Sequence, residues 1–92
     1  MITQTQLNLV KEYASLFFSL EEISMIAAID IEELRREVNF GHSALNNAYW
    51  IGKLEGQVEL RKQVKDWAKK GSSSAEQQLL VWSQKQQESE NG

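Results

Sequence analysis

The chain has 92 residues and a formal net charge of −3, a length that fits one domain. It contains no cysteine, which excludes a disulfide framework, a thiolate nucleophile and a cysteine metal site. No apolar run approaches the roughly 18 residues of a membrane span, and the polar N-terminus lacks the layout of a signal peptide. We therefore expect a cytoplasmic protein with no membrane partner.

The periodicity is helical from end to end, and the chain contains no proline. We expect an all-α protein of about five helices. The first helix should start near Thr5, with an apolar stripe made of Leu9, Val10, Tyr13, Ala14 and Phe17.

Two helix starts lie close together after this first helix. Ser19 is followed three residues later by Glu22, and Asp30 is followed three residues later by Glu33. A cap oxygen with a carboxylate one turn later is the sequence signature of a helix start. The spacing predicts a short helix, a break at Ala28 and a second helix, which is the pattern of a helix-turn-helix. The side chains predicted to enter its core are Ile23, Ile26, Ala27, Leu34 and Val38.

A long helix is predicted from Ala44 to Lys70, with Ser43 as its cap and Gly71 as the left-handed residue that ends it. Ser72 and the serines after it should start a last helix, which becomes polar from Gln84 onward. We therefore divide the chain into a helix-turn-helix head (1–43), a helical hairpin (44–88) and a frayed tail (89–92).

The long helix has two apolar faces, which predicts different partners for its two halves. The side chains expected to face the head are Leu45, Ile51, Leu54 and Val58, and those expected to face the last helix are Leu60, Val64, Trp67 and Ala68.

Small residues recur every four positions on the long helix, at Ala48, Gly52 and Gly56. Residues four apart lie on the same helix face, so another helix can approach closely there. That helix belongs either to the same chain or to a second copy. The second alternative makes these residues a candidate oligomer interface.

The second helix of a helix-turn-helix reads base edges, so its polar residues are the candidates for DNA contact. They are Arg35 and Arg36, with Asn39 beyond them. Glu32 and Glu37 on the same helix oppose binding to a polyanion. The alternative is a tri-helical unit that serves only as a scaffold.

Positive charge is concentrated in residues 39–70, which carry six basic and three acidic side chains. Arg61, Lys65 and Lys69 recur every four positions and line one face of the long helix, so this face can follow a phosphate backbone. The alternative is a solvated face whose cations pair with nearby carboxylates. The further basic candidate is Lys53, and the carboxylates are Glu55, Glu59 and Asp66.

Nothing in the sequence predicts catalysis. His42 is the only histidine, and one imidazole without cysteine or clustered carboxylates makes neither a metal site nor a triad. Most carboxylates lie at helix N-termini, where capping accounts for them. We expect no enzyme activity, no metal and no cofactor.

Two segments together resemble a known family. The first comprises Glu22-Ile23-Ser24, Ala28-Ile29-Asp30 and Leu34, in the pattern of a helix-turn-helix. The second runs from Ala48 to Gln87 and carries Ala48-Tyr49, Gly52-Lys53, Leu60-Arg61-Lys62, Ala68, Gly71-Ser72 and Trp82. With this spacing the chain resembles small terminase-like proteins of phages and prophages.

The resemblance implies a DNA-packaging recognition subunit without catalytic residues. Such proteins form ring-like oligomers through their central helices, bind viral DNA and regulate a separate packaging ATPase subunit. Two features depart from the family. Ala28 replaces the usual turn glycine, which fits only a turn that avoids positive φ. The chain is also short, with little sequence after the hairpin to engage the ATPase.

We therefore predict a non-catalytic, oligomeric DNA-binding module of phage or prophage origin. The alternative is a helical interaction or oligomerisation protein that keeps the helix-turn-helix as a scaffold without DNA binding.

Overall fold

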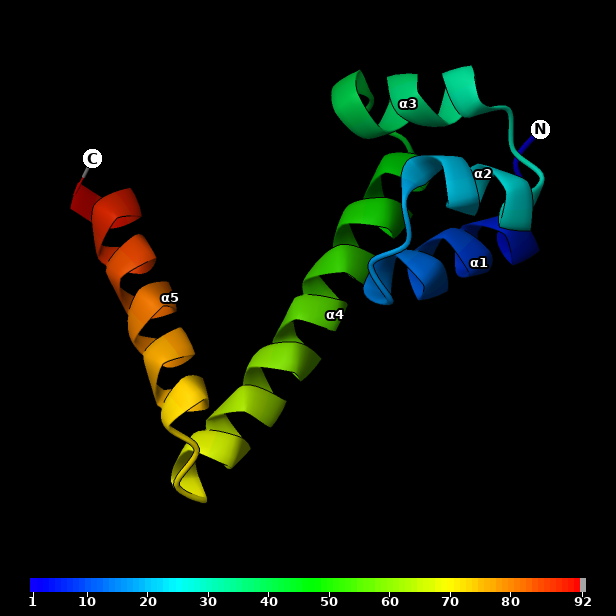
Figure 1. Ribbon diagram of the computed structural model, residues 1–92. Helices are drawn as coiled ribbons and strands as arrows, with labels where there is room; N and C mark the ends of the chain where they lie inside the picture. Colours follow the sequence, from blue (N-terminus) through cyan, green and yellow to red (C-terminus); the bar gives the residue numbers. More distant parts are fainter. Residues whose placement is uncertain (92) are drawn as a thin grey trace. The chain divides into compact units, whose positions relative to one another are not determined.

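The computed structural model describes residues 1–91, and this range contains five α-helices and no strand (Figure 1). The predicted all-α class with about five helices is confirmed. The helices are α1 (Gln4–Ser15), α2 (Leu20–Ala27), α3 (Ile31–Phe40), α4 (Ala44–Lys69) and α5 (Ser73–Asn91).

Side-chain oxygens cap the helices where the sequence predicts helix starts. Ser19 Oγ accepts from the Glu22 N–H at 3.2 Å, and Glu22 Oε1 accepts from the Ser19 N–H at 3.0 Å. This reciprocal pair satisfies two amides that the helix leaves open. The other helices start in related ways, at cap residues Thr3, Asp30, Ser43 and Ser72.

The chain forms two compact units, Met1–Gln57 and Val58–Gly92. The division falls inside α4, whereas the sequence placed it between residues 43 and 44. The physical reason is that the first half of α4 contributes to the core of the head: Leu45 and Tyr49 are both buried there.

The core of the first unit lies between α1, α2, α3 and the start of α4. Ile23, Leu34 and Val10 are fully buried. Burying such side chains supplies most of the stability of a small domain. The rest of this core consists of Ala14, Ala27, Ile29, Val38, Leu45 and Tyr49.

The small-residue face of α4 is covered by α1 of the same chain. A Cβ added to Gly52 would overlap the Lys11 carbonyl, and one added to Gly56 would overlap the Ser15 carbonyl. Ala48 packs against the same core. The prediction that these residues form an oligomer interface is therefore wrong, because the backbone of α1 already occupies the face that a second copy would need.

Several apolar side chains that the sequence predicted to be buried are exposed in the structure. Ile26 is 39% exposed, and Ile51 and Leu54 of α4 are 47% and 60% exposed. Phe17 lies beyond the end of α1 rather than in its stripe, and it is half exposed. The head covers the faces of α4 that carry Leu45, Tyr49 and the two glycines, and it leaves the side of Ile51 and Leu54 exposed.

The last helix continues further than the sequence suggested. α5 runs through the polar segment that follows Gln84 and into the predicted tail, as far as Asn91. This segment contains no glycine or proline before Gly92. Its glutamines, lysine and glutamates have good helix propensity. Gly92, the final residue of the predicted frayed tail, lies outside the described residues.

Candidate functional site

The turn between α2 and α3 positions the helix that would read DNA. Ala28 has φ 56° and ψ 47°, in the left-handed region, and the Ile29 N–H donates to the Ser24 carbonyl at 3.0 Å. The condition under which an alanine was expected to fit this turn, a backbone without positive φ, is therefore not met. A left-handed residue followed by such a bond closes the C-terminus of a helix, so α2 ends abruptly and Asp30 starts α3.

Gln6 of α1 holds this turn from the other side. Its Nε2 donates to the carbonyls of Ala27 and Ala28 at 3.1 and 3.2 Å. Its Oε1 accepts from the Thr3 N–H at 2.9 Å, so one side chain serves both the start of α1 and the end of α2. Sequence reasoning missed this role, because the two contacts lie on segments that are distant along the chain.

The C-terminus of α3 is held by α4. Asn46 Nδ2 donates to the carbonyls of Glu37 and Val38 at 2.9 and 3.1 Å. The indole N–H of Trp50 donates to the Val38 carbonyl at 3.0 Å. The Glu37 carbonyl also accepts from the Gly41 N–H at 3.0 Å, so side chains of α4 and the backbone together cap α3.

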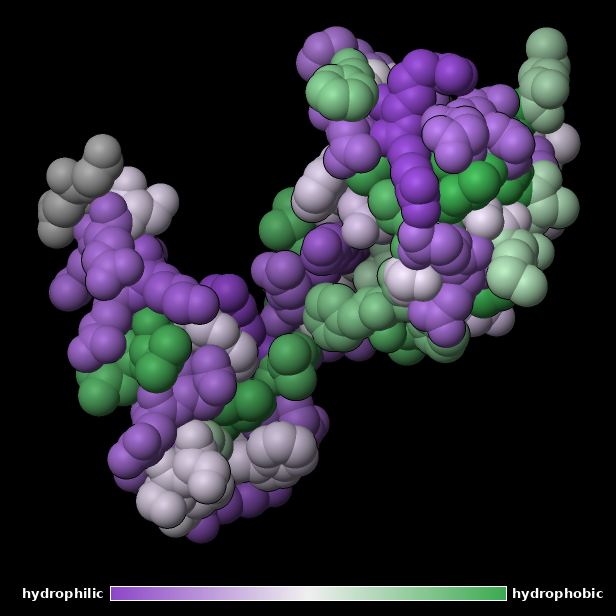
Figure 2. Space-filling view, turned by 45° about the horizontal axis from the view of Figure 1, so that its top comes forward, coloured by the Kyte–Doolittle hydropathy of each residue, from purple (hydrophilic) through white to green (hydrophobic). Residues whose placement is uncertain are grey.

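The exposed face of α3 carries the three residues predicted to contact DNA. Arg35 forms an ion pair with Glu21 of α2, which reduces its availability for a phosphate or a base. Arg36 and Asn39 are exposed, and neither forms a side-chain hydrogen bond or ion pair within residues 1–91. The surface around α3 is largely hydrophilic (Figure 2).

The pKa of Glu21, the partner of Arg35 in this ion pair, is lowered. Hydrogen bonding to its own backbone, followed by the hydrogen bond from Arg35, lowers the pKa of the Glu21 carboxyl below its ordinary value of 4.5. A lowered pKa in the folded state favours folding above the ordinary pKa, and this contribution disappears as the pH falls through the folded value. At neutral pH the pair is therefore formed, and its contribution to stability is small because both side chains are exposed.

Lys53 packs against aromatic rings of its own helix. Its Nζ lies 5.7 Å from the centroid of Tyr49 and 5.5 Å from that of Trp50. These distances fit a cation–π contact, and the side chain is half-buried. Lys53 is therefore the least accessible of the predicted DNA contacts.

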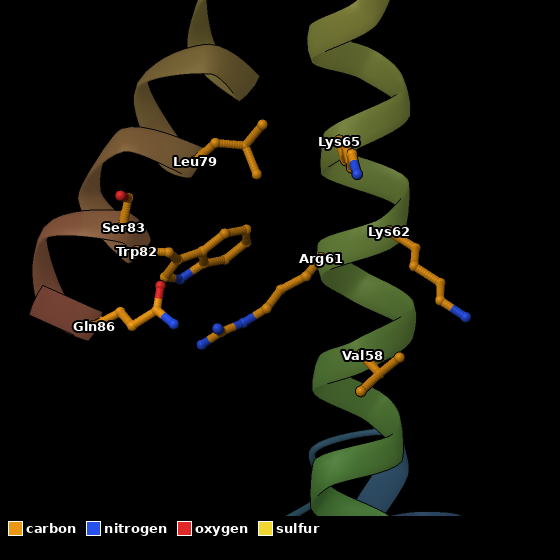
Figure 3. Close-up of a pocket in the computed structure, with 8 residues that line it drawn as sticks. All are labelled: Val58, Arg61, Lys62, Lys65, Leu79, Trp82, Ser83 and Gln86. Carbon is orange, nitrogen blue, oxygen red and sulfur yellow. The ribbon is translucent and has the colours of Figure 1, made fainter. Parts of the chain in front are cut away.

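The second unit contains a cavity between the second half of α4 and α5 (Figure 3). Its volume is about 540 Å³, within the range of ligand-binding pockets in proteins. Arg61 and Lys65, which the sequence predicted to share a face, both line it, whereas Lys69 does not. The lining residues are Val58, Arg61, Lys62, Lys65, Leu79, Trp82, Ser83 and Gln86.

Arg61 and Trp82 form the central contact of this cavity. The guanidinium carbon lies 4.8 Å from the centroid of the indole ring. Figure 3 shows Leu79 and Trp82 reaching from α5 toward α4, and Arg61 reaching from α4 toward Trp82. The sequence did not reveal the α5 side of the cavity, because only the hairpin brings these residues opposite Arg61.

The basic residues of the long helix do not pair with the carboxylates that the sequence offered. Within residues 1–91, the ion pairs are Arg35 with Glu21 and Lys11 with Glu55, the latter at 3.4 Å. Among residues 1–91, the cations that line the cavity therefore have no carboxylate partner, and Arg61 contacts the Trp82 ring. His42 is exposed in the loop before α4.

The described residues contain no group of three or more side chains suited to binding a metal ion. None of the helices in this range is long and apolar enough to cross a membrane. Comparisons with protein-family models, with curated proteins and with solved structures found no match. The resemblance to small terminase-like proteins therefore stays a prediction.

Proposed function

We propose that this chain is a non-catalytic DNA-binding module that works as an oligomer, in DNA packaging or in a related regulatory role. The observation that carries the proposal is that side chains of α1 and α4 hold both ends of α3, the helix that would read DNA. Gln6 fixes the turn before it, and Asn46 and Trp50 fix its end. A rigidly held helix with an exposed polar face suits entry into the major groove.

Arg36 and Asn39 are the side chains best placed for DNA contact. Arginine suits guanine or phosphate, and asparagine suits adenine. Glu32 on the exposed face weakens the attraction to phosphate. We therefore expect low affinity for a single head, which makes assembly into an oligomer important because linked heads bind together.

Fluorescence anisotropy with duplex DNA tests this proposal across a salt series. The double variant Arg36→Ala with Asn39→Ala should weaken binding by roughly tenfold or more, since each base contact contributes about 1–3 kcal/mol. The matched control is Asn47→Ala with Lys85→Ala, which removes the same charge from exposed positions elsewhere.

Unchanged affinity of the Arg36 and Asn39 variant would contradict DNA reading by α3. Binding that does not fall as salt rises would contradict phosphate contact altogether, because released counterions set that dependence.

Light scattering on the purified chain tests the oligomer. The glycine face of α4 is occupied, so the contacts must come from other surfaces, such as the exposed Ile51 and Leu54. A packaging ATPase remains the partner that the family resemblance proposes. A monomeric mass at all concentrations would contradict the oligomeric part of the proposal.

The second candidate is an interaction protein that uses the helix-turn-helix only as a scaffold. The observation favouring it is the exposed apolar surface of the head, where Met25 and Phe40 are each 82% exposed. Large apolar side chains of this kind would gain free energy by burial against a partner protein. Self-association without salt-dependent DNA binding would select this candidate.

A further inference from the structure

The α4–α5 hairpin lacks a core of its own. Among the described residues of the second unit, Val64 and Ala75 are the only apolar side chains that are buried. Two helices joined by a short turn are marginal in water unless they bury an apolar face. The hairpin therefore has apolar surface left for a further element.

The cavity in this hairpin is lined by apolar and basic side chains. Val58, Leu79 and Trp82 supply apolar surface, and Arg61 and Lys65 supply positive charge. No carboxylate lines it. Figure 2 shows hydrophobic side chains on both arms of the hairpin, bordered by hydrophilic ones.

We propose that this cavity is the docking groove for an acidic amphipathic helix of a partner protein. The partner's apolar side chains would cover Val58, Leu79 and Trp82, and its carboxylates would face the cations. Arg61 and Lys65 lie one turn apart on α4, about 6 Å along the axis. They match carboxylates that are also spaced one turn apart on an opposing helix.

The groove suits a helix better than a nucleic acid strand. Val58 and Leu79 offer aliphatic contact, which favours apolar side chains over phosphates. A two-fold pairing of this groove with itself is disfavoured, since the same cations would then face one another.

The inference does not rest on DNA binding by the head, and the two fail separately. The Arg36 and Asn39 variant described above leaves the groove intact. The groove variants below leave α3 intact.

The test is a display selection of helical peptides against the full chain. The library consists of peptides of about 18 residues with apolar residues fixed at helical spacing, and with all flanking positions randomised. We expect enrichment of peptides with aspartate or glutamate beside the apolar stripe at one-turn spacing. Enrichment of basic peptides, or of none, would overturn the proposal.

The affinity of the strongest selected peptide is then measured on variants by fluorescence anisotropy. Arg61→Glu with Lys65→Glu should weaken it by roughly tenfold, since the attraction is replaced by repulsion. The matched control is Lys70→Glu with Lys85→Glu, which changes the charge equally at exposed positions outside the groove. We expect less than about a threefold effect from this pair.

Circular dichroism tests whether each variant is folded, and Arg61→Gln with Lys65→Gln provides a milder pair if charge reversal unfolds the hairpin. Equal effects of the groove pair and the control pair would overturn the proposal. So would loss of DNA binding in the groove pair, which would assign the groove to nucleic acid. A changed oligomer mass in that pair would assign it to a second copy.

Discussion

Two residues of the head hold backbone conformations that glycine usually adopts. Phe17 has φ 64° and Ala28 has φ 56°, each just beyond the end of a helix. Both positions are followed by closing hydrogen bonds, from Phe18 to the Tyr13 carbonyl and from Ile29 to the Ser24 carbonyl. These bonds, together with the burial of Ile29, outweigh the strain of the left-handed conformation.

We expect Ala28→Gly to stabilise the head by about 0.5–1 kcal/mol. Glycine removes the left-handed strain, and part of this gain is lost to its greater freedom in the unfolded chain. Urea denaturation measures the change. Ala27→Gly is the control, because Ala27 is buried and helical, and it should destabilise by about 1 kcal/mol. Equal destabilisation by both variants would contradict the positive φ at Ala28.

Gln6→Glu isolates the bond that joins α1 to the turn. Glutamate keeps the acceptor for the Thr3 N–H but loses the donor to Ala27 and Ala28 and places a carboxylate against their carbonyls. We expect a loss of about 1–2 kcal/mol in the free energy of unfolding.

Thermal unfolding followed by circular dichroism measures this loss. Gln4→Glu serves as the control, since the Gln4 side chain bonds only to the exposed Asn8 side chain among the described residues. If the two variants unfold at the same temperature, the contact between Gln6 and the turn does not contribute.

Among the helices, the contact between α1 and α4 depends on the absence of side chains. Gly52 and Gly56 let the backbone of α4 approach the Lys11 and Ser15 carbonyls. Lys11 also forms an ion pair with Glu55 across this contact. The close approach brings the first half of α4 into the head, which in turn places Asn46 and Trp50 against α3.

Gly52→Ala should therefore destabilise the head by about 2 kcal/mol or more, because backbone atoms of α1 cannot move aside as a side chain would. Chemical denaturation provides the measurement. Asn47→Ala, at an exposed position of the same helix, should be neutral or slightly stabilising. A stabilising effect of Gly52→Ala, as helix propensity alone predicts, would contradict this contact.

For the chain as a whole, the two units differ in how much apolar surface they bury. The head has nine buried core residues, whereas the described part of the second unit buries Val64 and Ala75. Local stability follows buried contacts, so the head and the hairpin should open with different free energies.

Amide hydrogen exchange should report this difference. We expect the amides of α5 to exchange at least about 100-fold faster than those of Ile23 and Leu34, which lie in the core of the head. Adding a selected acidic peptide should slow exchange in α5 and leave the head unchanged. Equal protection of α5 and the head would show that the hairpin is stable without a partner.

Most starts and ends of the helices were predictable from the sequence. The capping pairs that begin with Ser19 and Asp30 span only three residues, and Gly71 ends α4 through its own left-handed φ of 96°. Because these interactions close within one helical turn, neighbouring residues are enough to predict them. The five helices and their approximate boundaries along the chain were therefore predictable.

The candidate sites were predictable only in part. The sequence identified Arg61 and Lys65 on one face of α4, but it did not connect them with Trp82. It predicted Arg35 as a DNA contact, but it did not predict the ion pair between Arg35 and Glu21 of the neighbouring helix.

The sequence allowed the glycine face to contact either a helix of the same chain or a second copy. In the tertiary structure, α1 of the same chain contacts it. In each case the deciding partner lies many residues away along the chain. Its position depends on how whole helices pack, and the spacing of residues within one helix does not say which other helix packs against it.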